Sequence, residues 1–228
     1  MTAADPGSML AAGEARREAS PADGWPDSMP TAGAGSTTPA GRAVAVSAAL
    51  AELTAEVARS VVVIRGGPGS SGSGVVWDQP RVVITNHHVV PGPQAQVVLP
   101  DGRRLPARVT RRAPALDLVA LELDTDLPGA ARVGDSDRLR PGDLVLAVGN
   151  PMAERNASTL GIVGALPAEH LQVAIDLRPG NSGGALANAR GEVVGIPHMV
   201  TGAGLALAVP SATVARFLGG DVEPLRWL

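Results

Sequence analysis

Gly180-Asn181-Ser182-Gly183-Gly184 is the stretch that decides the fold, because it surrounds a single serine with glycines. Glycine lets the backbone turn sharply beside a hydroxyl, since no Cβ stands in the way. A serine that attacks a carbonyl also needs backbone N–H groups aimed at the oxyanion that forms. The N–H groups of Gly180 and Ser182 are the candidate donors. The same string is also compatible with a polar turn, so the decision rests on whether a base and an acid lie upstream.

A histidine pair and an aspartate supply these partners, and each is joined to a strand-like run. His87 and His88 follow the apolar run 82–84, and Asp117 opens the apolar run 117–123. In a serine triad the histidine takes the hydroxyl proton and the aspartate orients the histidine. The order His, Asp, Ser along the chain is that of the chymotrypsin arrangement, whereas other triad folds use other orders. The sequence therefore predicts a nucleophilic serine rather than a simple turn.

Seven stretches of the sequence resemble the trypsin-like protease domain of the HtrA group, within the chymotrypsin superfamily. They are residues 72–76, 84–90, 99–103, 115–121, 148–151, 179–184 and 208–211. The resemblance implies that His88 is the general base, that Asp117 orients it and that Ser182 attacks. It implies a serine endopeptidase that hydrolyses polypeptides through an acyl-enzyme. The alternative is a catalytically weak or inactive module that binds unfolded polypeptides, because Arg178 stands where the family usually has a small or amide residue.

Short apolar runs separated by Gly, Pro and Asp turns continue from Val61 onward, which is typical of an all-β barrel or sandwich. The runs are 61–65, 73–78, 81–85, 95–99, 106–111, 117–123, 144–149, 158–165, 171–176, 184–187, 192–196 and 204–209. Asp101-Gly102 suits a tight hairpin turn between two of them. Together with the resemblance, they predict an all-β fold of two six-stranded antiparallel β-barrels. Barrel one covers about residues 60–125 and barrel two about 140–210, with the active site in the cleft between them.

The two ends of the chain differ from this pattern. Residues 1–42 are rich in Ala, Gly, Pro, Ser and Thr, which predicts a disordered segment before a protease domain at 43–220 and a tail at 221–228. Short helices are expected over 47–59 and 211–218, the second with Ser211 as its N-cap. The start lacks a signal-peptide pattern, and the apolar run 43–53 is too short and polar to span a membrane. A cytoplasmic location is the default expectation, and no PDZ domain, which many HtrA relatives carry, is seen.

Composition argues against several classes of function. The formal charge of −3 shows no surplus for nucleic acid, so the pairs Arg103-Arg104 and Arg111-Arg112 are interpreted as solvated hairpin residues. With no cysteine, disulfides and thiolate zinc sites are excluded. The four histidines lack a recognisable ligand spacing, so we predict no metal and no cofactor. HtrA domains often trimerise through N-terminal aromatic residues, and Trp25 alone lies in that region, which leaves a homo-oligomer possible.

The residues that select the substrate are the least constrained by the sequence. Asp176 lies six residues before Ser182, where relatives selective for Arg or Lys place a carboxylate at the pocket base. The favoured alternative is that Arg178 neutralises Asp176 on a strand face. The resemblance to HtrA enzymes otherwise implies a preference for small aliphatic residues. In that case the cleft is lined by Leu205, Ala206 and Leu207.

The remaining polar residues near the motifs have simpler expectations. Glutamyl-specific relatives use a nearby histidine to bind the substrate carboxylate, but the position of Pro197 favours His198 as a surface-loop residue. His87 is expected to face away from His88, and His170 shows no partner in the sequence. Digestive relatives have Asp in place of Asn181, and an amide cannot form the ion pair that activates a zymogen. Activation by proteolysis is therefore not expected.

Overall fold

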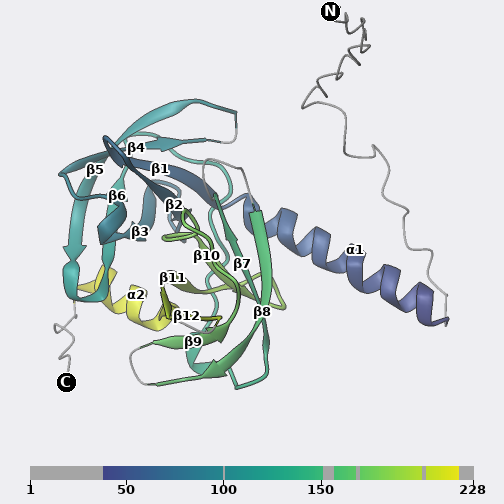
Figure 1. Cartoon of the computed structure of the whole chain (residues 1–228). Coiled ribbons are helices and arrows are strands. Elements are labelled where there is room, and N and C mark those ends of the chain that lie inside the picture. Colours follow the sequence, from purple (N-terminus) through teal and green to yellow (C-terminus); the bar gives the residue numbers. More distant parts are fainter. Residues whose placement is uncertain (1–37, 100, 151–156, 168–169, 202–203, 221–228) are drawn as a thin grey trace, which may run out of the picture.

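Two closed antiparallel β-barrels, one from each half of the chain, form the body of the molecule (Figure 1). The structure is a computed structural model, and it describes residues 38–99, 101–150, 157–167, 170–201 and 204–220. In barrel one the strands are hydrogen-bonded in the order β1-β2-β3-β6-β5-β4, and in barrel two in the order β10-β11-β12-β9-β8-β7. This confirms the predicted fold class of two six-stranded barrels.

The strands lie where the short apolar runs predict them, with small differences at their ends. They are β1 (Val61–Gly67), β2 (Ser70–Val76), β3 (Val82–Asn86), β4 (Gln94–Val98), β5 (Arg104–Ala113), β6 (Leu118–Glu122), β7 (Leu144–Gly149), β8 (Ala157–Ala165), β9 (Leu171–Ala174), β10 (Ala185–Asn188), β11 (Val193–Thr201) and β12 (Leu205–Pro210). The turn at Asp101-Gly102 joins β4 to its antiparallel partner β5, as predicted. Gly102 has a φ of 87°, which glycine adopts without strain.

The largest difference is at β11, which continues past its predicted end at residue 196 to Thr201. Pro197 lacks an N–H and was expected to interrupt the strand. It is accommodated because the register with β12 shifts between Pro197 and Met199, and because the pairing of β10 with β11 involves Val193 and Gly195 only. A proline in a strand is tolerated at such irregular or unpaired positions. The extension brings His198 into the strand.

A shared aliphatic core fixes the two barrels relative to one another. One buried cluster includes Ile84 and Leu118 from barrel one together with Leu146 and Val148 from barrel two. Each barrel also has an interior cluster of its own. Because the core between the barrels is continuous, loops at the junction are held by residues from both halves of the chain. The candidate site lies at this junction.

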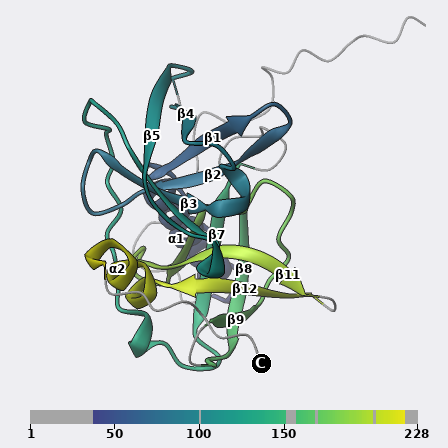
Figure 2. The ribbon, with the colours of Figure 1, turned by 90° about the vertical axis from the view of Figure 1, so that its left-hand side faces the viewer.

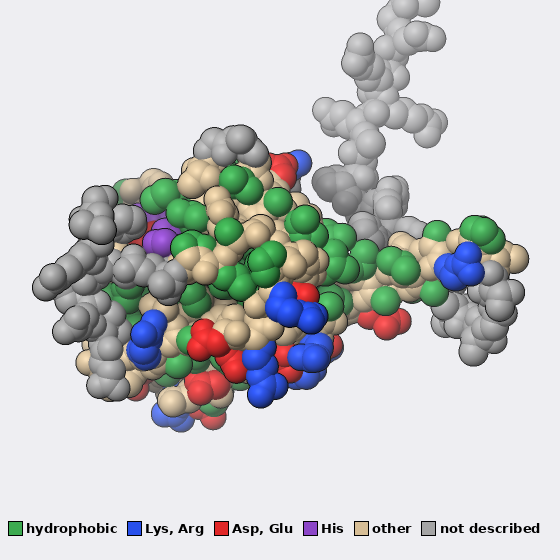
Figure 3. Space-filling view, turned by 90° about the horizontal axis from the view of Figure 1, so that it is seen from below, with side chains coloured by type: hydrophobic (Ala, Val, Ile, Leu, Met, Phe, Trp, Pro, Cys, Tyr) green, Lys and Arg blue, Asp and Glu red, His purple; other side chains and the backbone are tan. Residues whose placement is uncertain are grey.

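Helix α1 (Pro39–Ala58) begins earlier than predicted and projects from the barrels (Figures 1 and 3). Thr38 is its N-cap and accepts a hydrogen bond from the N–H of Gly41, and Pro39 occupies the first turn. The expectation of disorder up to residue 42 is therefore wrong for residues 39–42, while residues 1–37, including Trp25, lie outside the described part. Only the last turn is buried, at Val57 and Ala58. None of the helices in the described residues is long and apolar enough to cross a membrane.

Helix α2 (Ser211–Gly219) packs against β11 and β12 of barrel two (Figure 2). The predicted cap is wrong, because Pro210 is the N-cap residue and the Ser211 side chain does not cap the helix. The Ser211 hydroxyl instead donates to the Gly134 carbonyl at 2.7 Å and accepts from the Ser136 N–H at 3.1 Å. The hydroxyl thus links α2 to residues 126–143, the segment that connects barrel one to barrel two and is called the crossover below. The crossover contains the short 3₁₀ helix η3 (Ser136–Arg138). The predicted tail 221–228 lies outside the described residues.

Candidate active site

His88 and Asp117 form a close imidazole–carboxylate pair in barrel one. His88 Nδ1 lies 2.7 Å from Asp117 Oδ2, and the backbone N–H of His88 donates to Asp117 Oδ1 at 2.9 Å. His88 lies on the 3₁₀ helix η1 (His87–Val89), directly after β3. Asp117 follows the 3₁₀ helix η2 (Pro114–Leu116) and precedes β6, the strand paired with β3. Both oxygens of the Asp117 carboxylate therefore contact His88.

The backbone of Asp117 is held in an unusual conformation. Its φ of 53° and ψ of 40° place it in the left-handed region, and it is the single non-glycine residue with positive φ in the described part of the chain. Its carbonyl accepts hydrogen bonds from the His87 N–H and the Asn86 side-chain amide, both at 3.0 Å. Left-handed non-glycine residues persist where surrounding contacts fix them, and they often lie at functional sites. These two bonds hold the Asp117 backbone in this conformation.

The pairing changes the acidity of the histidine. The hydrogen bond with Asp117 and the negative charge of that carboxylate raise the pKa of His88 above its ordinary value of 6.5, against the opposing effect of partial burial. A histidine that donates Nδ1–H to a carboxylate keeps Nε2 as the acceptor on the opposite edge of the ring. The His88 side chain is half exposed, so Nε2 remains accessible to a reacting group.

Residues 180–184 form the loop around Ser182, the predicted nucleophile, and are called the nucleophile loop below. Two backbone N–H groups of this loop are free. Within the described residues, neither the N–H of Gly180 nor that of Ser182 has a hydrogen-bond partner, whereas the neighbouring N–H groups of Asn181 and Gly183 bind the carbonyls of Arg178 and Pro197. Gly180 has a φ of 103°, which favours glycine. The N–H groups of Gly180 and Ser182 are therefore available to an acceptor from outside the loop. Both residues are those predicted from the sequence.

Ser73 binds this loop to barrel one. In the sequence it is only one residue of the stretch 72–76 that resembles HtrA proteases, and no role is predicted for it. Its hydroxyl donates to the Gly180 carbonyl at 2.7 Å and accepts from the Asn150 N–H at 2.8 Å. Its own N–H donates to the Ser182 carbonyl at 2.9 Å. The signal that could have revealed this role is a serine flanked by glycines inside a strand, because glycines there let two backbones approach closely.

Glycines at the junction bring the nucleophile loop against the histidine segment. A Cβ on Gly72 would lie 2.8 Å from Val89 Cγ2, in η1, and 3.1 Å from the Ser182 carbonyl oxygen. A Cβ on Gly183 would lie 2.3 Å from the Ser73 carbonyl oxygen, and the φ of Gly183 is +79°. Side chains at these positions would push the loop away from barrel one. The contacts through Gly72 place Ser182 next to the segment that carries His88.

Arg103, Arg104 and Arg111 are exposed as predicted, but Arg112 is not a solvated residue. Its guanidinium donates to the carbonyls of Val90 and Gly92, each at 2.6 Å, and contacts His87 Nδ1. His87 is half-buried and faces Arg112 rather than Asp117, so its side chain points away from the site as predicted. The reason for the error is a register shift between β5 and β6 at Val109 and Arg111, which no local sequence signal indicates. Arg112 thus supports the segment that carries His88.

His198 is buried beside Asp117, so its expected place on a surface loop is wrong. Its side chain is 4% exposed, and its Nδ1 lies 3.9 Å from Asp117 Oδ2. His170, for which the sequence indicated no partner, stacks on His198 with 5.2 Å between ring centroids. Burial, reinforced by the nearby His170, lowers the pKa of His198 to about 4. His198 is therefore a neutral imidazole at pH 7, on the side of Asp117 away from solvent.

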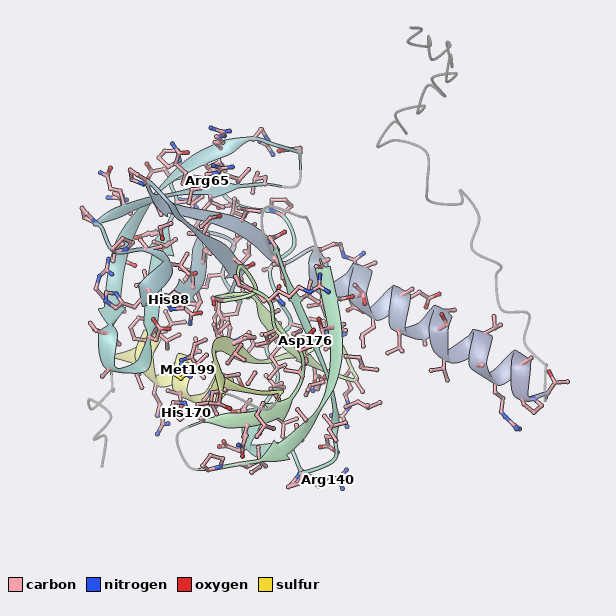
Figure 4. The ribbon with its side chains drawn as sticks, in the orientation of Figure 1. Arg65, His88, Arg140, His170, Asp176 and Met199 are labelled. Carbon is pink, nitrogen blue, oxygen red and sulfur yellow. The ribbon has the colours of Figure 1, made fainter. Side chains whose placement is uncertain are left out.

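A small pocket opens beside Ser182, and it contains only some of the predicted substrate-binding residues. Its walls are formed by residues 177–179 and by residues 197–200 of β11. Arg178 lines it, but Asp176 does not, and Asp176 lies well away from His88 and Met199 in Figure 4. Asp176 and Arg178 form no ion pair within the described residues, which leaves the predicted neutralisation without support.

The strand expected to line the cleft is not among the described walls of this pocket. Residues 205–207 pair with β9 and β11 and are absent from the walls of the pocket beside Ser182. Ala206 is buried in the interior cluster of the barrel, while Leu205 and Leu207 are partly exposed. The pocket is thus built by the segment before Ser182 and by the extended end of β11.

Known proteins share this architecture and these motifs. The trypsin-like peptidase domain matches residues 72–196, more than half of the chain. A probable periplasmic serine endoprotease, DegP-like, from Marinomonas sp. (strain MWYL1) is 37% identical over 161 residues, covering 64% of this chain and 34% of the relative. The mitochondrial serine protease HTRA2 of Drosophila erecta is 34% identical over 169 residues, covering 68% of this chain and 40% of the relative.

A solved structure adds the three-dimensional likeness. The HtrA-type protease AlgW with tripeptide superposes with a TM-score of 0.69 at 30% sequence identity, covering 76% of this chain and 63% of that chain. The chain spans between about a third and two fifths of the length of the two curated relatives named above. With the two barrels, the His88–Asp117 pair and the Ser182 loop in place, the chain belongs to the trypsin-like peptidase domain family and is similar to its HtrA-type proteases.

Proposed function

We propose that the protein is a serine endopeptidase that hydrolyses polypeptides by a Ser182–His88–Asp117 triad through an acyl-enzyme. The observation that carries the proposal is the 2.7 Å contact of His88 with Asp117 at the junction where the Ser182 loop meets barrel one. Membership of the trypsin-like peptidase family supports it. A serine hydroxyl is a weak nucleophile until a hydrogen-bonded imidazole takes its proton.

The reaction assigns one task to each group. Ser182 Oγ attacks the carbonyl carbon of the scissile bond as its proton passes to His88 Nε2, and Asp117 stabilises the imidazolium that forms. The N–H groups of Gly180 and Ser182 bind the oxyanion of the tetrahedral intermediate. The C–N bond then breaks, and the amine leaves with the proton from His88. Water, activated by the same histidine, hydrolyses the Ser182 ester and regenerates the hydroxyl.

A fluorophosphonate probe tests the proposal directly. The probe reacts with an activated serine, so we expect covalent labelling of the wild type and none of Ser182→Ala. Ser71→Ala is the matched control, because Ser71 is an exposed serine on β2 outside the site, and it is expected to label like the wild type. Absence of label in a folded wild type, or a label that survives in Ser182→Ala, would contradict the proposal.

A second function is favoured by one observation. A site poised for attack has a hydrogen bond between the serine hydroxyl and the histidine. Within the described residues, no hydrogen bond joins His88 to Ser182. A module that binds unfolded polypeptides with little catalysis accounts for this arrangement. Binding of a permanently unfolded protein by an unlabelled wild type supports this second function. Apo sites often tighten only around substrate, which is why the endopeptidase is preferred.

A further inference from the structure

The pocket beside Ser182 is small, and among the described residues that line it Arg178 carries the charge. Its volume is about 140 Å³. Apolar walls come from residues such as Leu177, Met199 and Val200, and the polar groups include Arg178 and His198, with no Asp or Glu among the described residues of the lining. We propose that this pocket accepts an acidic side chain, glutamate or aspartate, at the residue before the scissile bond. The inference rests on the proposed endopeptidase function and adds its substrate class.

Arg178 supplies the positive charge. It is exposed at the pocket, and within the described residues it forms no ion pair, even with Asp176 two positions away. A guanidinium binds a carboxylate by charge-assisted hydrogen bonds that are about twice as strong as neutral ones. A substrate carboxylate in the pocket would provide the counter-charge that the described residues do not.

His198 supplies a second, buried polar group on the pocket wall. Its side chain is 4% exposed, and its Nε2 has no hydrogen-bond partner within the described residues. Because Nδ1 faces Asp117 and the two ring nitrogens point in different directions, Nε2 is directed away from that carboxylate. An unpaired buried polar atom is costly. A substrate carboxylate favours either the Nε2–H tautomer or the imidazolium, and both of these donate to it.

The apolar walls and the basic groups together select the length and the charge of the substrate side chain. The methylene groups of a glutamate side chain can contact the apolar walls while its carboxylate reaches the basic groups. A small aliphatic side chain, the preference implied by the HtrA resemblance, would leave Nε2 of His198 and the Arg178 charge unpaired. A basic side chain would meet Arg178 without a counter-charge, because Asp176 does not line the pocket.

The test uses peptides that differ only at the residue before the scissile bond, with Glu, Asp, Gln, Val or Arg. We expect the wild type to cleave the Glu peptide with a kcat/KM at least about tenfold above the Gln peptide, as expected for a hydrogen bond to a charged group. Arg178→Gln is expected to bring this ratio close to one, and Arg178→Glu to shift the preference toward the Arg peptide. The control is Arg65→Gln, because Arg65 is exposed and distant from Met199 in Figure 4. It is expected to keep the wild-type ratio.

Two results would overturn the inference while leaving the endopeptidase intact. One is equal or better cleavage of the Gln or Val peptide by the wild type, and the other is a Glu/Gln ratio that persists in Arg178→Gln. Cleavage that is lost in Ser182→Ala would show in both cases that the proposed function holds. If the wild type cleaves no peptide and Ser182 takes no fluorophosphonate label, the proposed function fails and the substrate preference fails with it.

Discussion

The hydroxyl of Ser73, on a strand of barrel one, donates a 2.7 Å hydrogen bond to the carbonyl of Gly180 in the nucleophile loop of barrel two. The N–H of the same residue binds the carbonyl of Ser182 at 2.9 Å. One residue therefore fixes the carbonyls on both sides of Asn181 relative to the barrel that carries His88. The two candidate oxyanion donors belong to these same residues, so Ser73 helps to hold the residues that carry them in place.

Replacement of Ser73 by alanine is expected to reduce activity more than stability. The substitution removes the bond to Gly180 and leaves its carbonyl and the Asn150 N–H without the hydroxyl, at a cost of about 1–3 kcal/mol. A loop displaced by about 1 Å can lose about a hundredfold in rate. We expect kcat/KM on a peptide substrate to fall by about 10- to 100-fold while circular dichroism stays unchanged. Ser71→Ala on the same strand should keep full activity, and an equal loss in both variants would contradict the prediction.

The activity is expected to rise with pH through the pKa of His88. The imidazole must be neutral to accept the Ser182 proton, and the hydrogen bond with Asp117 raises its pKa above 6.5. The midpoint of the acidic limb of kcat/KM should therefore lie above pH 6.5. In Asp117→Asn the raising effects disappear and burial remains, so the pKa of His88 should fall, as measured by NMR titration of the ring. The rate should fall by about 10⁴-fold. An unchanged pKa of His88 in this variant would show that Asp117 does not control it.

Arg112 and Arg111 form a matched pair for a stability measurement. Arg112 donates to two carbonyls beside η1 and contacts His87, whereas Arg111 is exposed. Arg112→Ala is expected to lower the free energy of unfolding by about 2 kcal/mol or more, because hydrogen bonds from charged donors contribute about 1.5–3 kcal/mol. Arg111→Ala should change it by less than about 0.5 kcal/mol. Urea denaturation measures both, and similar losses in the two variants would show that the bonds of Arg112 are not the cause.

The sequence predicted the strands from their apolar runs, and the resemblance to HtrA proteases supplied their arrangement as two barrels. Continuous apolar runs mark β3 and β6, and His88 and Asp117 lie beside the ends of these strands. The glycines around Ser182 indicate a sharp turn by themselves. These features depend on local chemistry, so a single sequence reveals them. The order His, Asp, Ser then reduces the possible folds to very few.

The features that could not be predicted depend on register and on packing between distant segments. A shift between β11 and β12 lets the strand continue through Pro197, and it carries His198 into the interior. Another shift, between β5 and β6, accompanies the inward position of Arg112. The Ser211 hydroxyl serves the crossover rather than its own helix because Gly134 and Ser136 lie within reach. No pattern within a few residues encodes any of these partners.

Acid is expected to destabilise the protein through His198. Burial, with the nearby His170, lowers the pKa of His198 from 6.5 to about 4. Between these values the unfolded chain binds a proton at this histidine that the folded chain does not, so stability falls as the pH falls through this window. The difference in pKa corresponds to at most about 3 kcal/mol.

Substitution of His198 isolates this effect from the other titrating groups. The groups that face it are Asp117, His88 and His170, and they are retained in His198→Asn. Between pH 7 and pH 4.5, the free energy of unfolding of the variant should therefore fall by about 2 kcal/mol less than that of the wild type. Urea denaturation at both pH values measures the two losses. Equal losses would mean that His198 takes up its proton in the folded protein near the ordinary pKa, and that it is not held neutral beside Asp117.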